Sequence, residues 1–300
     1  MPLAKSKTKP KPNNFTLSFE AIGTQWTVEF FDTAESEKKI EKMILQRIET
    51  FDKNYSRFRT DSLVTKMSQT AGKYTLPADA KPMMDMYEEL YQISQGLMTP
   101  LIGQALSDAG YDASYSFRPK KVTSPPSWDE AMNYNFPVLN LKKPFLLDFG
   151  ALGKGYLVDI LGELLTAVCD GFIINAGGDI LAKNGAVEVA LENPNDTTEA
   201  IGIATINGQA ICGSAGNRRA WAGYSHILNP KNLSSPQHIA AVWVVAKNTM
   251  LADALTTALY FVDVQGLHKR YNFDYAMLKT DGSLVYSSNF PATFFNPENV

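Results

Sequence analysis

One segment organises the chain: residues 145–165, which read FLLDFGALGKGYLVDILGELL. Three apolar residues lead to Asp148, and a glycine-rich loop then runs from Gly150 to Gly155. After the loop, leucine and isoleucine recur at the three- and four-residue spacing of an amphipathic helix. The segment therefore predicts a strand that ends at Asp148, a tight loop and a helix.

The glycine-rich loop has two interpretations. Bare backbone N–H groups next to a helix N-terminus favour an anion, commonly a phosphate, and Lys154 adds a positive charge at the same place. Alternatively, the glycines form a turn that only lets a helix pack closely against a strand. The loop is not the phosphate loop of nucleotide hydrolases, because no Ser or Thr follows the Gly-Lys pair. Its glycines also stand at the wrong offsets for a dinucleotide fingerprint.

Composition narrows the class of protein. The chain has 300 residues, of which 45% are hydrophobic, so it can bury a large core. The net charge of −3 gives no sign of a nucleic-acid-binding surface. No apolar segment approaches the length of a membrane span. Without internal repeats or a linker, the chain is predicted to form one mixed α and β domain over residues 15–300.

The first 14 residues differ from the rest of the chain. They contain four lysines between prolines and almost no apolar residues, which predicts a disordered basic tail rather than a signal peptide. The two cysteines, Cys169 and Cys212, lack metal-ligand spacing and are expected to be buried free thiols in a reducing compartment. We therefore expect a cytoplasmic protein, unless a leader precedes this chain.

The remaining elements follow from apolar spacing and turn residues. A hairpin is predicted over residues 15–31, and residues 108–140 are expected to form an irregular surface excursion. Helices are predicted over 34–51, 82–95 and 251–262, with Asp61-Ser62 capping a short helix and Asn248-Thr249 starting the last one. Strands are predicted over 186–192, 201–206, 209–213, 239–246, 275–279 and 283–287, with turns at 176–179 and at Asp281-Gly282.

His226 is the one histidine in a polar, turn-rich setting. It follows Arg218 and Arg219 in the segment that ends GYSHILNP. A lone histidine is either structural or a general base, and the arginines either bind phosphate or form a solvated surface pair. The sequence leaves both pairs of alternatives open.

Asp253 and Thr257 lie four residues apart on a helix that is otherwise apolar or small, so they share one face. A buried carboxylate needs a partner, and a carboxylate with a hydroxyl suits Mg²⁺, which often takes few protein ligands. The alternative is that Asp253 is a first-turn charge favoured by the helix dipole.

Six motifs in order resemble the ApbE family, the FAD:protein FMN transferases, from Phe19 to about Gly266. They are Ile22-Gly23-Thr24, Ser56-Arg57-Phe58 with Asp61-Ser62, DFGALGKGYLVD from Asp148, Ile174-Asn175-Ala176-Gly177-Gly178-Asp179, SHILNP from Ser225 and ADALTT from Ala252. The resemblance implies an α+β fold: a single ApbE-like, T-fold-related domain with a flavin cleft. It also implies Mg²⁺-dependent transfer of FMN from FAD to a Ser or Thr of a flavoprotein, with release of AMP.

The resemblance assigns roles to individual residues. His226 is expected to help deprotonate the acceptor hydroxyl, and Asp253 is expected to act in catalysis as a metal ligand. The expected metal ligands are Ala151 through its carbonyl, Asp253, Thr257 and, as in some members, Thr256. The expected FAD-binding residues are Ile22, Phe58, Leu97, Met98, Thr99, Asp148, Lys154 and Leu228.

Three departures from the family pattern bear on activity. Thr99 stands where the family has an Asp, Asn229 also replaces an Asp, and residues 213–217 differ from the family motif. Because Asn supplies neither a base nor a charge, turnover or acceptor docking is expected to change. The alternative function is therefore an FAD-binding protein, or an FAD pyrophosphatase, with little or no transferase activity.

Overall fold

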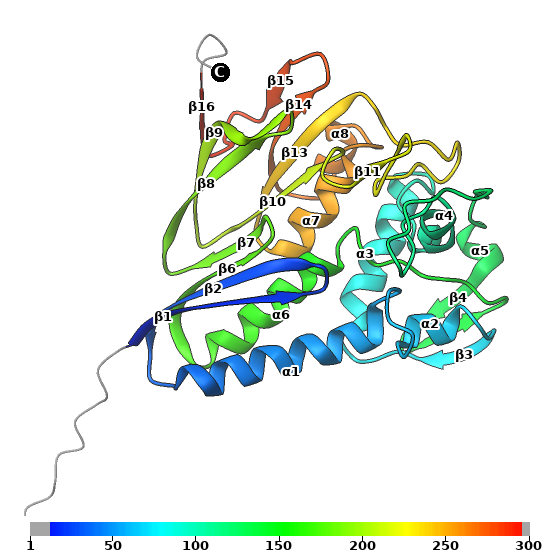
Figure 1. Cartoon of the computed structure of the whole chain (residues 1–300), viewed down its shortest axis with the longest axis horizontal. Helices are drawn as coiled ribbons and strands as arrows, with labels where there is room; N and C mark the ends of the chain where they lie inside the picture. Colours follow the sequence, from blue (N-terminus) through cyan, green and yellow to red (C-terminus); the bar gives the residue numbers. More distant parts are fainter. Residues whose placement is uncertain (1–12, 296–300) are drawn as a thin grey trace, which may run out of the picture.

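The structure, a computed structural model, describes residues 13–295 and is built on an eight-stranded sheet (Figure 1). Each strand pairs antiparallel with its neighbour. In spatial order the strands are β1 (Asn13–Ala21), β2 (Thr24–Thr33), β6 (Cys169–Ala176), β7 (Asp179–Lys183), β10 (Ala210–Ala215), β13 (Ile239–Ala246), β14 (Asp274–Lys279) and β15 (Leu284–Tyr286).

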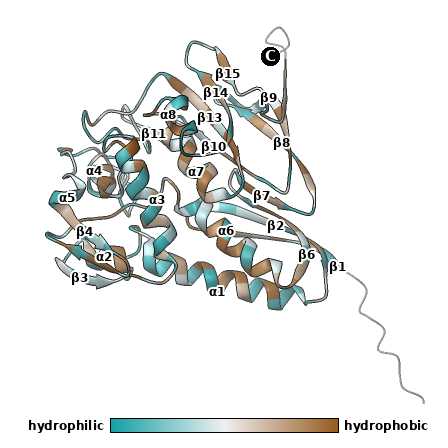
Figure 2. Cartoon of the chain, turned by 180° about the vertical axis from the view of Figure 1, so that it is seen from behind, coloured by the Kyte–Doolittle hydropathy of each residue, from teal (hydrophilic) through white to brown (hydrophobic). Residues whose placement is uncertain are grey.

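Both faces of this sheet are covered, which explains why β13 is apolar along its whole length. Helices α6 (Gly153–Thr166) and α7 (Thr249–Ala258) pack on one face, and α1 (Glu37–Tyr55) packs on α6. A three-stranded sheet covers the other face and contains β8 (Ala186–Asn193), β9 (Asp196–Asn207) and β16 (Ala292–Phe294). Figure 2 shows apolar residues along α6 and α7, the two helices that pack on the sheet. The fold is thus a single α+β domain, as predicted.

Beyond α1, a smaller unit extends the helical layer. It contains α3 (Ala80–Ile93), α2 (Leu63–Met67) and a sheet of β3 (Gly72–Thr75), β5 (Val138–Leu141) and β4 (Met132–Asn135), with α5 (Trp128–Ala131) beside β4. The prediction of an irregular excursion over residues 108–140 is therefore wrong for its last part. The two β4–β5 strands are four residues each, too short for alternation to identify them.

Most other predicted elements are present, with shifted ends. Helix α1 begins three residues later than predicted and extends four residues further, and α3 begins two residues earlier. The remaining short elements are η1 (Pro100–Ile102), α4 (Gly103–Asp108), β11 (Ala220–Trp221), β12 (Tyr224–Ser225) and α8 (Val264–His268).

The strand predicted to end at Asp148 does not form. The backbone there is not part of any sheet in the described chain, and two of its N–H groups donate to carbonyls of the short helices α2 and η1 instead. Phe145 N–H donates to the Met67 carbonyl at 3.3 Å, and Asp148 N–H donates to the Pro100 carbonyl at 2.7 Å. An apolar run was thus buried by helices and loops rather than by neighbouring strands.

The predicted basic tail lies mostly outside the described residues, although Asn13 and Asn14 already belong to β1. Among residues 13–295, no helix is both long enough and apolar enough to cross a membrane.

Candidate active site

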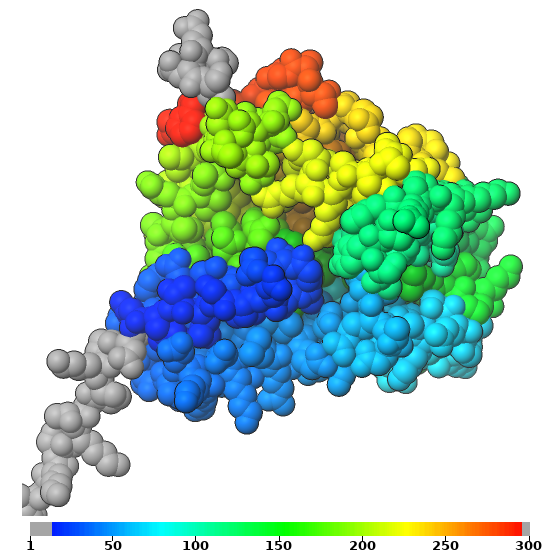
Figure 3. Space-filling view, in the orientation of Figure 1, coloured from blue at the N-terminus to red at the C-terminus, as the bar shows by residue number. Residues whose placement is uncertain are grey.

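A cavity of about 600 Å³ opens where three parts of the chain meet. Its walls come from the tip of the β1–β2 hairpin, the loops around residues 97–115, and the segment from β10 to residue 228. Helix α7 and the glycine-rich loop form the deep end, through Asp253, Thr257 and Lys154. Figure 3 shows the hollow at the surface where the blue hairpin, the green loop and the yellow segment adjoin.

Nearly all of the residues expected to act in catalysis or to bind FAD or metal meet in this cavity. Only Thr256, of the thirteen, is not part of the lining: it is buried, and its hydroxyl donates to the Asp253 carbonyl at 2.7 Å. The residues that do line it are Ile22, Phe58, Leu97, Met98, Thr99, Asp148, Ala151, Lys154, His226, Leu228, Asp253 and Thr257.

The glycine-rich loop brings helices α6 and α7 into close contact. The Gly155 N–H donates to Asp253 Oδ2 at 2.9 Å. A Cβ at position 155 would lie 2.4 Å from the Thr249 carbonyl oxygen, so only glycine allows this approach. At the start of the loop, Asp148 Oδ1 accepts from Gly150 N–H at 2.7 Å. Close packing therefore explains Gly155, while the cationic Lys154 beside it still faces the cavity.

Two carboxylates share one cation at the deep end. Lys154 forms an ion pair with Asp179, whose side chain is 1% exposed, and Asp253 lies close to both. Burial, followed by repulsion from Asp179, raises the pKa of Asp253 well above its ordinary value. Burial lowers the pKa of Lys154, but the two carboxylates outweigh it and the pKa is raised. One negative charge thus lacks a counter-charge whenever both carboxylates are ionised.

A second buried ion pair was not predicted from the sequence. The Arg57 Nε donates to Asp148 Oδ2, and its Nη1 donates to the Tyr111 carbonyl at 2.6 Å. The guanidinium also lies 4.2 Å from the centroid of the Phe58 ring. Both Asp148 oxygens are therefore occupied by this chain, so Asp148 positions Arg57 and the loop.

His226 lies in the cavity wall with its Nδ1 atom buried and without a hydrogen-bond partner among the described residues. Burial, and next the charge of Arg219, lowers its pKa to about 4. The imidazole is therefore neutral near pH 7 and able to accept a proton. Arg219 itself donates to the Tyr111 hydroxyl.

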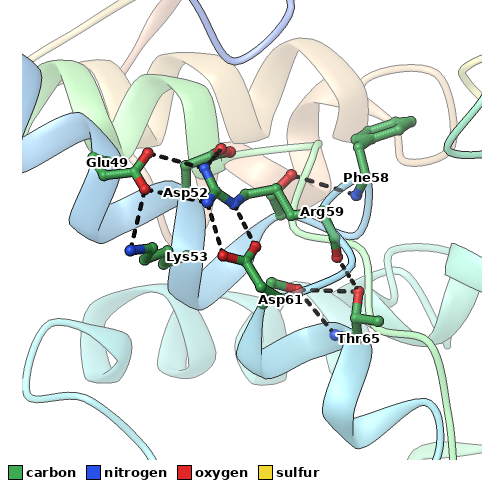
Figure 4. Close-up of polar contacts among 9 residues, drawn as sticks. Glu49, Asp52, Lys53, Phe58, Arg59, Asp61 and Thr65 are labelled. Carbon is green, nitrogen blue, oxygen red and sulfur yellow. Dashed lines mark hydrogen bonds and ion pairs between the residues drawn. The ribbon is translucent and has the colours of Figure 1, made fainter.

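An ion-pair network holds the loop that carries Phe58. Arg59 contacts three carboxylates, those of Glu49, Asp52 and Asp61, at 2.8–3.1 Å (Figure 4). In the same view the Phe58 ring points away from the network. These carboxylates neutralise the Arg59 guanidinium. The network therefore holds the loop in place and does not provide an unpaired cation for a ligand in the cavity.

Two departures from the family pattern occupy helix and turn ends. Thr99 Oγ1 accepts from Leu101 N–H at 3.2 Å and caps η1. The Asn229 side chain accepts from Lys231 N–H at 2.9 Å and does not line the cavity. An Asp at either position would accept the same bond, so both replacements keep the local backbone.

Within residues 13–295, no three His, Cys, Asp or Glu side chains form a metal-binding cluster. The available hard-oxygen donors are the Asp253 carboxylate and the Thr257 hydroxyl in the lining, together with the Ala151 backbone. Mg²⁺ commonly binds through one or two carboxylates and completes its shell with water and phosphate, so this donor set fits.

Comparisons with known proteins identify the family and agree with the overall fold. The profile of the ApbE family matches residues 22–274. The FAD:protein FMN transferase of Haemophilus influenzae is 24% identical, over 96% of this chain and 93% of its own length. That of Chlamydia pneumoniae is 25% identical over 72% of this chain and 73% of its own. The flavin transferase ApbE from Vibrio cholerae superposes with a TM-score of 0.78 at 19% identity, covering 93% of this chain and 99% of its own.

Proposed function

The chain belongs to the ApbE family, and from that premise we propose that it transfers FMN from FAD to a Ser or Thr hydroxyl of a target flavoprotein, releasing AMP. The enzymes similar to it over most of their length are FAD:protein FMN transferases. The observation that carries the proposal is the convergence of Lys154, His226 and Asp253 in one cavity with the residues expected to bind FAD.

The deep end of the cavity suits a diphosphate. The Lys154 ammonium faces the cavity with 27% of its side chain exposed. Arg219 also lines the cavity and adds positive charge, whereas the charge of Arg218 is paired with Glu192. Transfer of this kind depends mainly on positioning and on compensating charge that develops on phosphate oxygens.

A divalent cation, Mg²⁺ by donor type, would be held by the Ala151 carbonyl, Asp253 and Thr257. When bound, it would supply Lewis-acid stabilisation of phosphate charge. The raised pKa of Asp253 supports this assignment. Burial and the nearby Asp179 carboxylate disfavour the ionised form of Asp253, and a bound cation would stabilise that form.

The neutral His226 is proposed to receive the proton of the acceptor hydroxyl. The hydroxyl oxygen forms a bond to the FMN phosphorus, and the bond between that phosphorus and the bridging oxygen breaks. The electron pair of the broken bond leaves with AMP, and the proton passes to His226. Catalysis therefore needs the imidazole in its neutral form.

A cytoplasmic location is part of the proposal. It is supported by Cys169 and Cys212, both buried and free in the described chain. Cell fractionation that recovers the full-length protein from a membrane or the periplasm would contradict it.

The proposed function is tested by incubating the protein with FAD, Mg²⁺ and an acceptor domain that the Haemophilus influenzae relative flavinylates. We expect flavin fluorescence to migrate with the acceptor in a denaturing gel, and AMP to appear in equal amount. EDTA is the control for the metal. Release of AMP and FMN without labelled protein would indicate a pyrophosphatase, and bound FAD that stays intact would indicate a passive binder.

A further inference from the structure

The rim of the cavity carries four aromatic side chains, which we call the aromatic rim. Tyr115 and Phe117 are exposed, whereas Trp221 and Tyr224 are half-buried. Tyr115 and Phe117 are each 42% exposed, although both are large and apolar. Their rings lie next to one another: the ring centroids of Tyr115 and Phe117 are 6.2 Å apart, and those of Phe117 and Trp221 are 5.4 Å apart. Tyr115 lines the cavity and Phe117 does not. The rim therefore extends outward from the site.

The backbone holds these side chains outward under strain. Tyr115 and Phe117 have φ angles of 52° and 50°, in the left-handed region that bulky residues seldom adopt. Such conformations persist where the surrounding structure enforces them, and they cluster at functional sites.

The loop is also preorganised by hydrogen bonds. The Asp112 carboxylate accepts from the N–H groups of Ser114 and Ser116 at 2.9 and 3.1 Å, and from both of their hydroxyls. Phe117 N–H donates to the Gly110 carbonyl at 2.8 Å. On the other side, Trp221 Nε1 donates to the Ala109 carbonyl at 2.7 Å. Little conformational entropy remains to be lost when a partner binds, which favours affinity.

Positive charge lies next to the aromatic rim. Arg118, Lys120 and Lys121 are exposed and form no ion pair with any carboxylate in residues 13–295. By contrast, Arg59 and Arg218, nearer the cavity, are each paired with a carboxylate. The loop that exposes Tyr115 and Phe117 therefore also carries three cations that have no ion-pair partner among the described residues.

We propose that the aromatic rim and these three cations bind the acceptor flavoprotein. This inference rests on the proposed function, because an acceptor hydroxyl must pass this opening to reach the deep end of the cavity. The partner segment that fits has an apolar side chain beside its Ser or Thr, to pack on Phe117, and acidic residues nearby, to pair with the loop cations. Exposed aromatic anchors with a charged surround are typical of interface hot spots.

The test compares Phe117→Ala with the wild type, using the same acceptor domain. We expect kcat/KM for the acceptor to fall about tenfold, as for truncation of an anchoring aromatic. The Kd for FAD, measured by flavin fluorescence, should stay unchanged because Phe117 does not line the cavity. Tyr286→Ala is the matched control, since Tyr286 is 52% exposed on β15, at the opposite edge of the sheet from the hairpin.

A second variant tests the charges independently of the aromatic side chains. Arg118→Glu with Lys120→Glu should raise the KM for the acceptor. Added salt should raise the KM of the wild type by screening attraction, and lower that of the variant by screening repulsion. Unchanged acceptor kinetics in both variants would overturn the inference and leave the proposed function intact. A weaker Kd for FAD in Phe117→Ala would overturn it too, by assigning the rim to FAD. A wild type that transfers no FMN would refute the proposed function itself, and the docking surface with it.

Discussion

At the scale of single residues, His226 makes the protein sensitive to acid. Its folded pKa of about 4 lies below the ordinary value of 6.5, so the unfolded chain binds more protons between these two pH values. Stability is therefore complete above pH 6.5 and decreases as the pH falls toward 4, by at most about 3 kcal/mol from this group. Because part of the ring faces the cavity, solvent reduces that figure.

We expect His226→Gln to remove this part of the acid sensitivity and to abolish FMN transfer. The measurement is chemical unfolding of both proteins at pH 7.5, 6 and 5, with transfer assayed in parallel. The difference in the free energy of unfolding between wild type and variant should become smaller, or change sign, as the pH falls. A constant difference across the three pH values would show that His226 does not titrate as inferred.

The sequence located most side chains of the site, since they lie in short motifs whose order along the chain is recognisable. It missed Arg57 and Asp179 as charge partners. Arg57 pairs with Asp148, 91 positions away, and Asp179 at the start of β7 pairs with Lys154 on α6. No local pattern encodes such a pairing, because only the tertiary fold brings the partners together.

At the scale of elements, Asp159 on α6 ties two helices together. Its two carboxylate oxygens accept from the N–H groups of Thr249 and Met250, both at 2.8 Å, at the N-terminus of α7. Asn248 caps the same helix by accepting from Leu251 N–H at 3.0 Å, but it makes no bond to α6. Asp159 therefore both caps α7 and fixes its position against the glycine-rich loop.

We predict that Asp159→Ala and Asn248→Ala each lower stability by about 1–2 kcal/mol, as the loss of a helix cap does. Only Asp159→Ala should also weaken FAD binding, because it releases α7 from Lys154 and its loop. Thermal melts and FAD titrations of both variants provide the comparison. Equal FAD affinity in the two variants would show that Asp159 only caps α7 and does not position it for FAD binding.

Elements with long, regular periodicity were predicted well. The predictions for β13 and α6 matched the structure. A strand buried on both faces shows a continuous apolar run, and a helix buried along one side shows apolar residues at helical spacing. The segment before Asp148 was apolar but too short to show a period, so its burial among loops could not be distinguished from a strand. The small β3–β5–β4 sheet was missed for the same reason.

At the scale of the whole molecule, the cavity joins parts of the chain that lie far apart in the sequence. The hairpin at residues 22–24, the loops near 97–115 and helix α7 all contribute to its walls. A ligand that fills this space binds the folded state alone. Ligand binding therefore stabilises the entire domain, and the size of the effect reports affinity.

FAD at one hundred times its Kd should stabilise the protein by about 2.7 kcal/mol. For a chain of 300 residues that corresponds to a rise in Tm of roughly 4 °C. Mg²⁺ added with FAD should raise the Tm further, because Asp253 gains a cation as the diphosphate enters. Asp253→Asn should lose the Mg²⁺ increment and keep most of the effect of FAD alone.

The same variant should melt higher than the wild type without ligand at pH 7.5. The folded pKa of Asp253 is raised, so the ionised carboxylate opposes folding as the pH rises through that value, and the neutral amide removes this effect. We expect a gain of the order of 1 kcal/mol. Thr257→Val is the matched control, since it removes a neutral donor and leaves the charge in place. If Asp253→Asn retains the full Mg²⁺ increment, or melts lower without ligand, Asp253 is a structural residue of α7 and the cation must be held elsewhere.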